Sequence, residues 1–203
     1  VLILDRSILS DVPEREALWE HRGHVASELN NRLGARLDMT ITYSDVARST
    51  AVGDLSASFS DGQRSEAVKE LSDTFCDMVY GSNLQHALLL ARAGCRSFES
   101  NRILLITYSL PSAHQGTDKP FFFEPLHPES LEAAKGEADA CHVDGLDALV
   151  LLGDDDDRSS LLTRYFVDLT GTTDGKAVST GLSEPPATAV HKFAAASGLR
   201  MPE

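Results

Sequence analysis

The chain has 203 residues, 42% of them hydrophobic, which is enough for one domain with an ordinary apolar core. Asp and Glu number 31 against 18 Lys and Arg, a net charge of −13, which disfavours nucleic acid and anionic lipid as partners. No apolar run approaches the roughly 20 residues that cross a bilayer, so no membrane span is expected.

Targeting and redox signals are sparse. No signal peptide stands at the start, although the chain begins without Met inside an apolar run, which suggests a start trimmed from a longer sequence. Three widely spaced cysteines, Cys76, Cys95 and Cys141, form no CxxC pair. We therefore expect free thiols and a reducing, cytoplasmic location.

The first half of the chain predicts strands separated by helices. A continuous apolar run predicts a buried strand, and Pro13 followed by acidic residues is typical of a helix start. The predicted elements are a strand at Val1–Leu4, a helix from about Asp11 to Leu33 ended by Gly34, a half-buried strand at Met39–Tyr43, a weaker strand at Leu55–Phe59 and a helix at Ser65–Val79.

The second half continues this alternation. Its strongest signal is an apolar helical face from Asn83 to Phe98. The predicted elements are that helix, a buried strand at Ile103–Ile106, a long ordered loop at Pro111–Pro128, a helix at Pro128–His142, a strand at Ala148–Leu152, a helix at Arg158–Leu169, a short strand at Ala177–Ser179 and a short helix at Ala187–Ala196.

Strands that alternate with helices predict a doubly wound α/β fold, with a mostly parallel central sheet and helices on both faces. We expect one domain at residues 1–181 and a C-terminal tail with a short helix at 182–203. Ligands of such folds bind at the carboxyl ends of the strands. Asp5, Ser7, Ser82 and Tyr108 should lie at or near that edge.

Three segments together resemble the von Willebrand factor type A (VWA) domain, a Rossmann-like fold. They are Asp5-Arg6-Ser7 after the first apolar run, Tyr80-Gly81-Ser82-Asn83-Leu84-Gln85-His86-Ala87-Leu88, and Thr107-Tyr108-Ser109-Leu110-Pro111-Ser112-Ala113-His114. The last two are similar to segments of bacterial VWA proteins encoded beside MoxR-type AAA ATPases. The resemblance therefore implies a protein-interaction domain that works with such an ATPase.

The resemblance also implies a metal-ion-dependent adhesion site, and here the sequence departs from the family pattern. Asp5 and Ser7 match the first two ligands, but Leu9 has no oxygen to offer at the third position. Ser82 stands where Thr is usual, and Tyr108 stands where a second Asp is expected. With one carboxylate lost, we expect a degenerate site that binds magnesium weakly or not at all.

Simpler structural roles remain open for the same residues. Asp5 and Ser7 could satisfy backbone groups of their own loop, and Ser82 could cap the following helix. Ser10 could supply the hydroxyl that Leu9 lacks. The run Asp154–Asp157 lacks the ligand spacing of a calcium loop and is more typical of a helix start.

No GxSxG elbow, P-loop or GxGxxG motif is present, so the sequence does not predict an enzyme. The favoured function is metal-independent protein recognition; the alternatives are a Mg-dependent VWA domain that uses Asp5, Ser7, Ser10 and Ser82, and a hydrolase or transferase. The predicted contact residues are Asp5, Ser7, Ser10, Gly81, Ser82, Asn83, Tyr108 and His114, on the edge formed by 5–10, 81–83 and 108–114.

Overall fold

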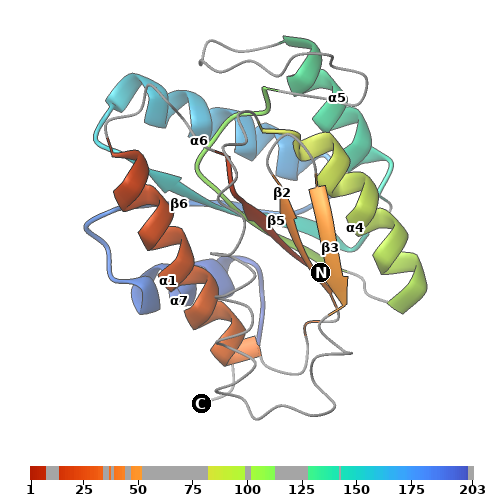
Figure 1. Ribbon diagram of the computed structural model, residues 1–203, viewed down its shortest axis with the longest axis horizontal. Coiled ribbons are helices and arrows are strands. Elements are labelled where there is room, and N and C mark those ends of the chain that lie inside the picture. Colours follow the sequence, from red (N-terminus) through yellow and green to blue (C-terminus); the bar gives the residue numbers. More distant parts are fainter. Residues whose placement is uncertain are drawn as a thin grey trace.

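The computed structural model describes residues 1–7, 14–33, 37, 39–43, 47–51, 82–98, 102–112, 128–141 and 143–200, with the backbone alone for 47–51 and 96–98. Six strands form one sheet in the order β3-β2-β1-β4-β5-β6 (Figure 1). All neighbouring strands are parallel except β3, which pairs antiparallel with β2. The strands are β1 (Leu2–Asp5), β2 (Met39–Tyr43), β3 (Ala47–Ala51), β4 (Arg102–Thr107), β5 (Gly145–Leu152) and β6 (Ala177–Gly181).

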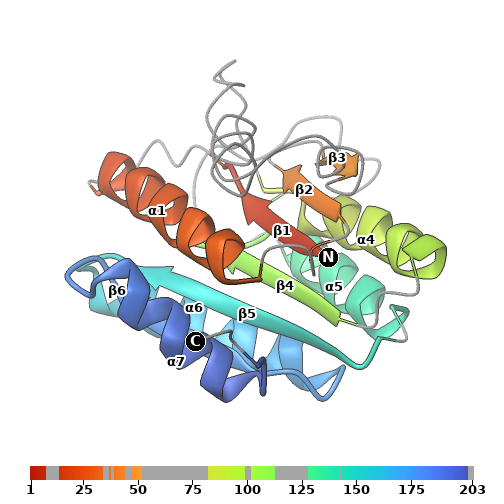
Figure 2. The same ribbon diagram turned by 90° about the horizontal axis from the view of Figure 1, so that it is seen from below.

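Helices cover both faces of this sheet. Seen in Figure 2, α1 (Arg15–Leu33) and α7 (Pro186–Ala196) lie on one face. On the other face lie α4 (Leu84–Phe98), α5 (Pro128–Asp139) and α6 (Asp156–Gly171). This arrangement confirms the doubly wound α/β fold with a mostly parallel sheet. No helix in the described part of the chain is long and apolar enough to span a bilayer.

Two apolar clusters fill the spaces between the sheet and its helices. Because side chains of a strand alternate between faces, Ile3 packs in the cluster beneath α4, α5 and α6, while Leu2 and Leu4 pack in the cluster beneath α1 and α7. All three are completely buried. The continuous apolar run at the start of the chain is therefore a strand covered on both faces, as predicted.

The acidic run before α6 is a helix start. Asp155 is the N-cap, and its carboxylate accepts a hydrogen bond from the backbone N–H of Arg158 at 2.9 Å. Asp156 and Asp157 occupy the first turn, where the helix dipole favours negative charge. The helix thus begins two residues earlier than predicted.

The third strand differs from the prediction. The structure has β3 at Ala47–Ala51, whereas residues 55–59, where a weak strand was predicted, lie outside the described residues. The sequence Ala-Arg-Ser-Thr-Ala carries no alternation of bulky apolar residues, so its strand character comes from pairing with β2. The helix predicted at 65–79 and residues 113–127 of the predicted loop also lie outside the described residues.

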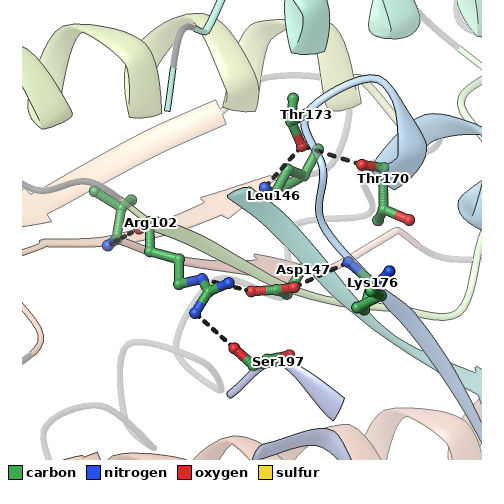
Figure 3. A network of polar contacts seen from close by, with 8 residues as sticks. Arg102, Leu146, Asp147, Thr170, Thr173, Lys176 and Ser197 are labelled. Carbon is green, nitrogen blue, oxygen red and sulfur yellow. Dashed lines mark hydrogen bonds and ion pairs between the residues drawn. The ribbon is translucent and has the colours of Figure 1, made fainter. Parts of the chain in front are cut away.

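The strand β5 begins three residues before its predicted start, and the added residues include a buried acid. Asp147 is completely buried in mid-strand, with its Oδ2 2.9 Å from Arg102 Nε, and its Oδ1 accepts the backbone N–H of Lys176 at 2.9 Å (Figure 3). Burial raises the pKa of Asp147, and these two contacts partly oppose that rise. The ion pair lets an otherwise unfavourable residue continue the strand.

The helix α7 packs into the domain. Val190 and Phe193 are completely buried in the cluster beneath α1. Just after the helix, the carbonyl of Ser197 accepts a hydrogen bond from Arg102 Nη1 at 2.5 Å, which links the end of α7 to the start of β4 (Figure 3). The helix predicted within the C-terminal tail is therefore present, and its apolar face contributes to the core.

A carboxylate and hydroxyl cluster at the carboxyl edge of the sheet

Asp5 ends β1, and its side chain collects hydroxyl donors from two strand ends. Oδ1 accepts the backbone N–H of Ser7 at 2.8 Å and the Ser7 hydroxyl at 2.6 Å. Oδ2 accepts the hydroxyls of Thr107 at 2.7 Å and Ser109 at 2.5 Å. Each hydrogen bond to a charged acceptor contributes roughly 1.5–3 kcal/mol. The carboxylate is completely buried yet satisfied from both sides.

Ser82 brings a third segment to the same point. Its hydroxyl lies 3.0 Å from Ser109 Oγ, which is itself 3.3 Å from Ser7 Oγ. The loop after β4 is tied to the start of α4 twice more, because Ser82 N–H donates to Ser112 Oγ and Ser112 N–H donates to the Ser82 carbonyl, both at 2.9 Å. Segments far apart in the chain therefore meet on one edge, as the sequence predicted. We call Asp5, Ser7, Ser82, Thr107 and Ser109 the hydroxyl cluster.

Ser82 does not cap α4. The cap is Asn83, whose side-chain oxygen accepts the backbone N–H of His86 at 3.0 Å. The side chain of Ser82 is thereby left for the hydroxyl cluster.

Tyr43 borders the hydroxyl cluster from β2. Its hydroxyl is 3.3 Å from Thr107 Oγ1. Burial raises the pKa of Tyr43 well above its ordinary value, and the negative charge of Asp5 raises it further, although hydrogen bonds with Thr107 and Ser82 oppose the rise. Tyr43 therefore remains a neutral phenol at any physiological pH.

Tyr108 points away from the hydroxyl cluster, although the sequence places it where the family pattern expects a second Asp ligand. Its ring is buried with Leu4 and Ile106 in the cluster beneath α1 and α7, and its hydroxyl donates to the Ser7 carbonyl at 2.5 Å. The physical reason is the alternation of side chains along a strand, which turns Tyr108 to the face opposite Thr107. Burial raises the pKa of Tyr108, and Asp5 adds to the rise.

Three guanidinium groups lie close to this edge. Arg22, which is completely buried, donates from Nη1 to the backbone carbonyl of Asp5 at 2.5 Å. Arg22 and Arg6 both lie over the ring of Trp19, at 4.2 and 5.4 Å from its centroid. Arg158 donates from Nη2 to the Tyr108 carbonyl at 2.5 Å. Positive charge thus lies beside the Asp5 carboxylate.

The chemistry of these donors does not fit a magnesium site. Asp5 is the one carboxylate of the hydroxyl cluster, and the hydroxyls of Ser7, Thr107 and Ser109 are all donated to it. Each of these hydroxyls keeps its lone pairs while it donates, but neutral hydroxyls add no negative charge, so among these groups Asp5 alone would have to balance the charge of a dication. The described residues contain no group of three or more His, Cys, Asp and Glu that could hold a metal. The neighbouring guanidiniums further oppose a dication.

The structure changes the role expected for the predicted contact residues. The predicted contact residues that the structure describes are buried, so they support the edge and do not present side chains to a partner. They are Asp5, Ser7, Ser82 and Tyr108, at most 1% exposed, and Asn83 at 6%. The other predicted contact residues, Ser10, Gly81 and His114, lie outside the described residues, as does Leu9 of the family pattern.

Sequence reasoning missed Thr107, Ser109 and Tyr43. A signal was available for the first two. Residues 107 and 109 are two apart, so they share a face of the strand end, and Tyr108 between them must face the other way. Nothing in the sequence singles out Tyr43, which reaches the cluster because β2 pairs with β1.

Exposed acids lie beside this edge, at the starts of α1 and α6. We call Glu14, Glu16 and Asp154–Asp157 the acidic rim; all are exposed except Glu14, which is half-buried. A β-carbon at Gly153 would lie 3.1 Å from Glu14 Oε2, so the two segments are neighbours. Arg15 and Arg158 are the basic residues within these segments, and the acids outnumber them.

Comparisons with known proteins agree with this architecture. A family model described as "Rv0959-like protein, vWA domain" matches residues 40–194, which is more than half of the chain. The vWF domain of the type V pili tip protein Mfa5 from Porphyromonas gingivalis is similar over 100% of this chain and 96% of that one, with a TM-score of 0.61 and 11% identity. The SpRpn10 VWA domain is similar over 94% and 92%, with a TM-score of 0.52 and 10% identity.

A von Willebrand factor type A protein from Catenulispora acidiphila is 15% identical with a TM-score of 0.55, and the match covers 95% of this chain but 40% of that one. At these identities the structural likeness shows the fold alone. No curated protein sequence matches the chain.

Proposed function

Because the chain belongs to the Rv0959-like vWA-domain family, we propose that it is a non-catalytic protein-recognition domain that binds its partner without a metal ion. The observation that carries this proposal is the hydroxyl cluster. Donors from Ser7, Thr107 and Ser109 saturate the Asp5 carboxylate, so the edge is held together by protein groups alone. A preformed edge binds at a lower entropic cost.

The absence of catalysis is supported by accessibility. Asp5 and the serines of the hydroxyl cluster are at most 1% exposed, so a substrate would not reach them. Burial raises the pKa of the Cys141 thiol to about 12, with Glu137 adding to the rise, which leaves it protonated and unreactive at neutral pH.

The partner proposed is a MoxR-type AAA ATPase. Two features support it: the resemblance of residues 80–88 and 107–114 to VWA proteins encoded beside such ATPases, and the acidic rim, which fits a basic surface. On this proposal the exposed acids make the contact, and the buried hydroxyl cluster holds the neighbouring ends of β1 and β4 in place.

The test is binding of the full chain to a purified MoxR-type ATPase from the same source, measured by biolayer interferometry with magnesium and with chelator. Asp154→Asn with Asp157→Asn should weaken binding about 3–10-fold, because two exposed charges leave the acidic rim. The matched control, Asp139→Asn with Asp144→Asn, removes two exposed acids from the end of α5 and the start of β5, at the opposite edge.

Three results would contradict the proposal: no binding of the ATPase, equal weakening by both double variants, or binding abolished by chelator. Strict dependence on magnesium would favour the Mg-dependent alternative.

A further inference from the structure

The hydroxyl oxygen of Ser109 lies where three segments of the chain meet. It is 2.5 Å from Asp5 Oδ2, 3.0 Å from Ser82 Oγ and 3.3 Å from Ser7 Oγ. These three groups are the ones that the family resemblance assigns as metal ligands. Ser109 itself is completely buried. One protein atom therefore touches every described residue that would be expected to touch an ion.

An ion and this hydroxyl cannot share the space. Magnesium requires oxygen ligands at about 2.0–2.1 Å on several sides, so it would have to sit between Asp5, Ser7 and Ser82. Ser109 Oγ already occupies a point within hydrogen-bonding distance of all three. It also donates to the carboxylate oxygen that an ion would need.

The backbone around Ser109 holds this position. The Ser109 N–H donates to Thr107 Oγ1 at 3.4 Å, and the same Thr107 oxygen lies 3.2 Å from the Ser109 carbonyl oxygen. The bend after β4 is thus fixed by its own side chain. This bend therefore fixes the position of the Ser109 hydroxyl.

We propose that Ser109 is a built-in substitute for the metal ion. Its hydroxyl joins the segments that carry Asp5, Ser7 and Ser82, which an ion would otherwise join. The edge consequently keeps one arrangement whatever the concentration of divalent cation. This inference rests on the metal-independent function proposed above and assigns its structural cause to one side chain.

The test compares two variants by titration with Mn²⁺, followed by electron paramagnetic resonance of the free ion and by thermal unfolding. Ser109→Gly removes the whole side chain and opens the position, so we expect Mn²⁺ to bind at least about tenfold more tightly than to the unaltered protein and to raise the melting temperature. Ser109→Ala also removes the hydroxyl oxygen while it keeps the β-carbon, so it should bind Mn²⁺ more tightly than the unaltered protein as well.

Tighter Mn²⁺ binding by Ser109→Gly and by Ser109→Ala than by the unaltered protein would support the inference. Equal affinity of all three proteins, or no binding by a folded Ser109→Gly, would overturn it. If Ser109→Gly does not fold, Ser109→Asp is compared with Ser109→Asn. The added carboxylate would face Asp5, so only Ser109→Asp should gain thermal stability from magnesium; no gain would overturn the inference.

These outcomes are independent of the partner. If Ser109→Gly stays free of metal while ATPase binding is insensitive to chelator, the inference fails and the proposed function stands. If Ser109→Gly binds Mn²⁺ but the unaltered protein binds no ATPase, the proposed function fails and the inference stands.

Discussion

Replacing Tyr108 by Asp restores the residue that the family pattern expects, yet the structure predicts that it will unfold the domain and not create a metal site. The Tyr108 ring is 1% exposed in the apolar cluster beneath α1 and α7. Removing a buried aromatic ring costs about 3–5 kcal/mol. The new carboxylate would also have to be buried or the strand end displaced, which adds several kcal/mol.

The total, more than about 5 kcal/mol, is comparable to the 5–15 kcal/mol that stabilises a typical domain. Urea unfolding followed by circular dichroism, with and without magnesium, measures it. Tyr108→Phe is the control: it keeps the ring and loses only the hydrogen bond to the Ser7 carbonyl, at a cost of about 1–3 kcal/mol. A Tyr108→Asp protein that stays folded within 1.5 kcal/mol of the unaltered one, and gains stability from magnesium, would refute the placement of this ring.

Two further predictions concern buried ionisable groups. Burial, and to a smaller extent His24, lower the folded-state pKa of His21 below 6.5, and Glu184 opposes this shift. The unfolded chain therefore takes up this proton first, so stability should fall as the pH drops through 6.5, and His21→Gln should flatten the fall in a thermal-shift series at pH 5–8. Arg102→Ala leaves Asp147 buried without its ion-pair partner. Because the Arg102 side chain is 36% exposed, we expect a cost of about 1–3 kcal/mol in urea unfolding. Arg102→Met combined with Asp147→Leu should recover most of that loss, and a double variant that is no more stable than Arg102→Ala would contradict this role of the ion pair.

The sequence predicted best the elements whose own apolar residues show which of their faces are buried. The run Val1–Leu4 and the helical face from Asn83 to Phe98 needed no knowledge of their neighbours. In contrast, Ala47–Ala51 forms a strand only because β2 lies beside it, and Asp147 stays within β5 only because Arg102 reaches it. Such pairings join residues far apart in the chain and leave no local signal.

The candidate site divides in the same way. The resemblance correctly brought Asp5, Ser7 and Ser82 to one edge, because the order of strands and loops fixes which loops meet there. It did not show which side chain of the segment Thr107-Tyr108-Ser109 faces Asp5. A motif identifies which residue stands at a position, whereas the direction of its side chain depends on the pleat of the strand and on how the strand ends.

By itself, the sequence determined the layered α/β architecture and the convergence of three loops, because hydrophobic periodicity and chain order are both written along the chain. Only the tertiary structure decided that Ser109 and not Tyr108 turns toward Asp5, and that the predicted contact residues within the described ranges are buried. The physical reason is that a buried carboxylate must be satisfied by whichever donors the packed chain brings within about 3 Å, and that distance is set by long-range packing.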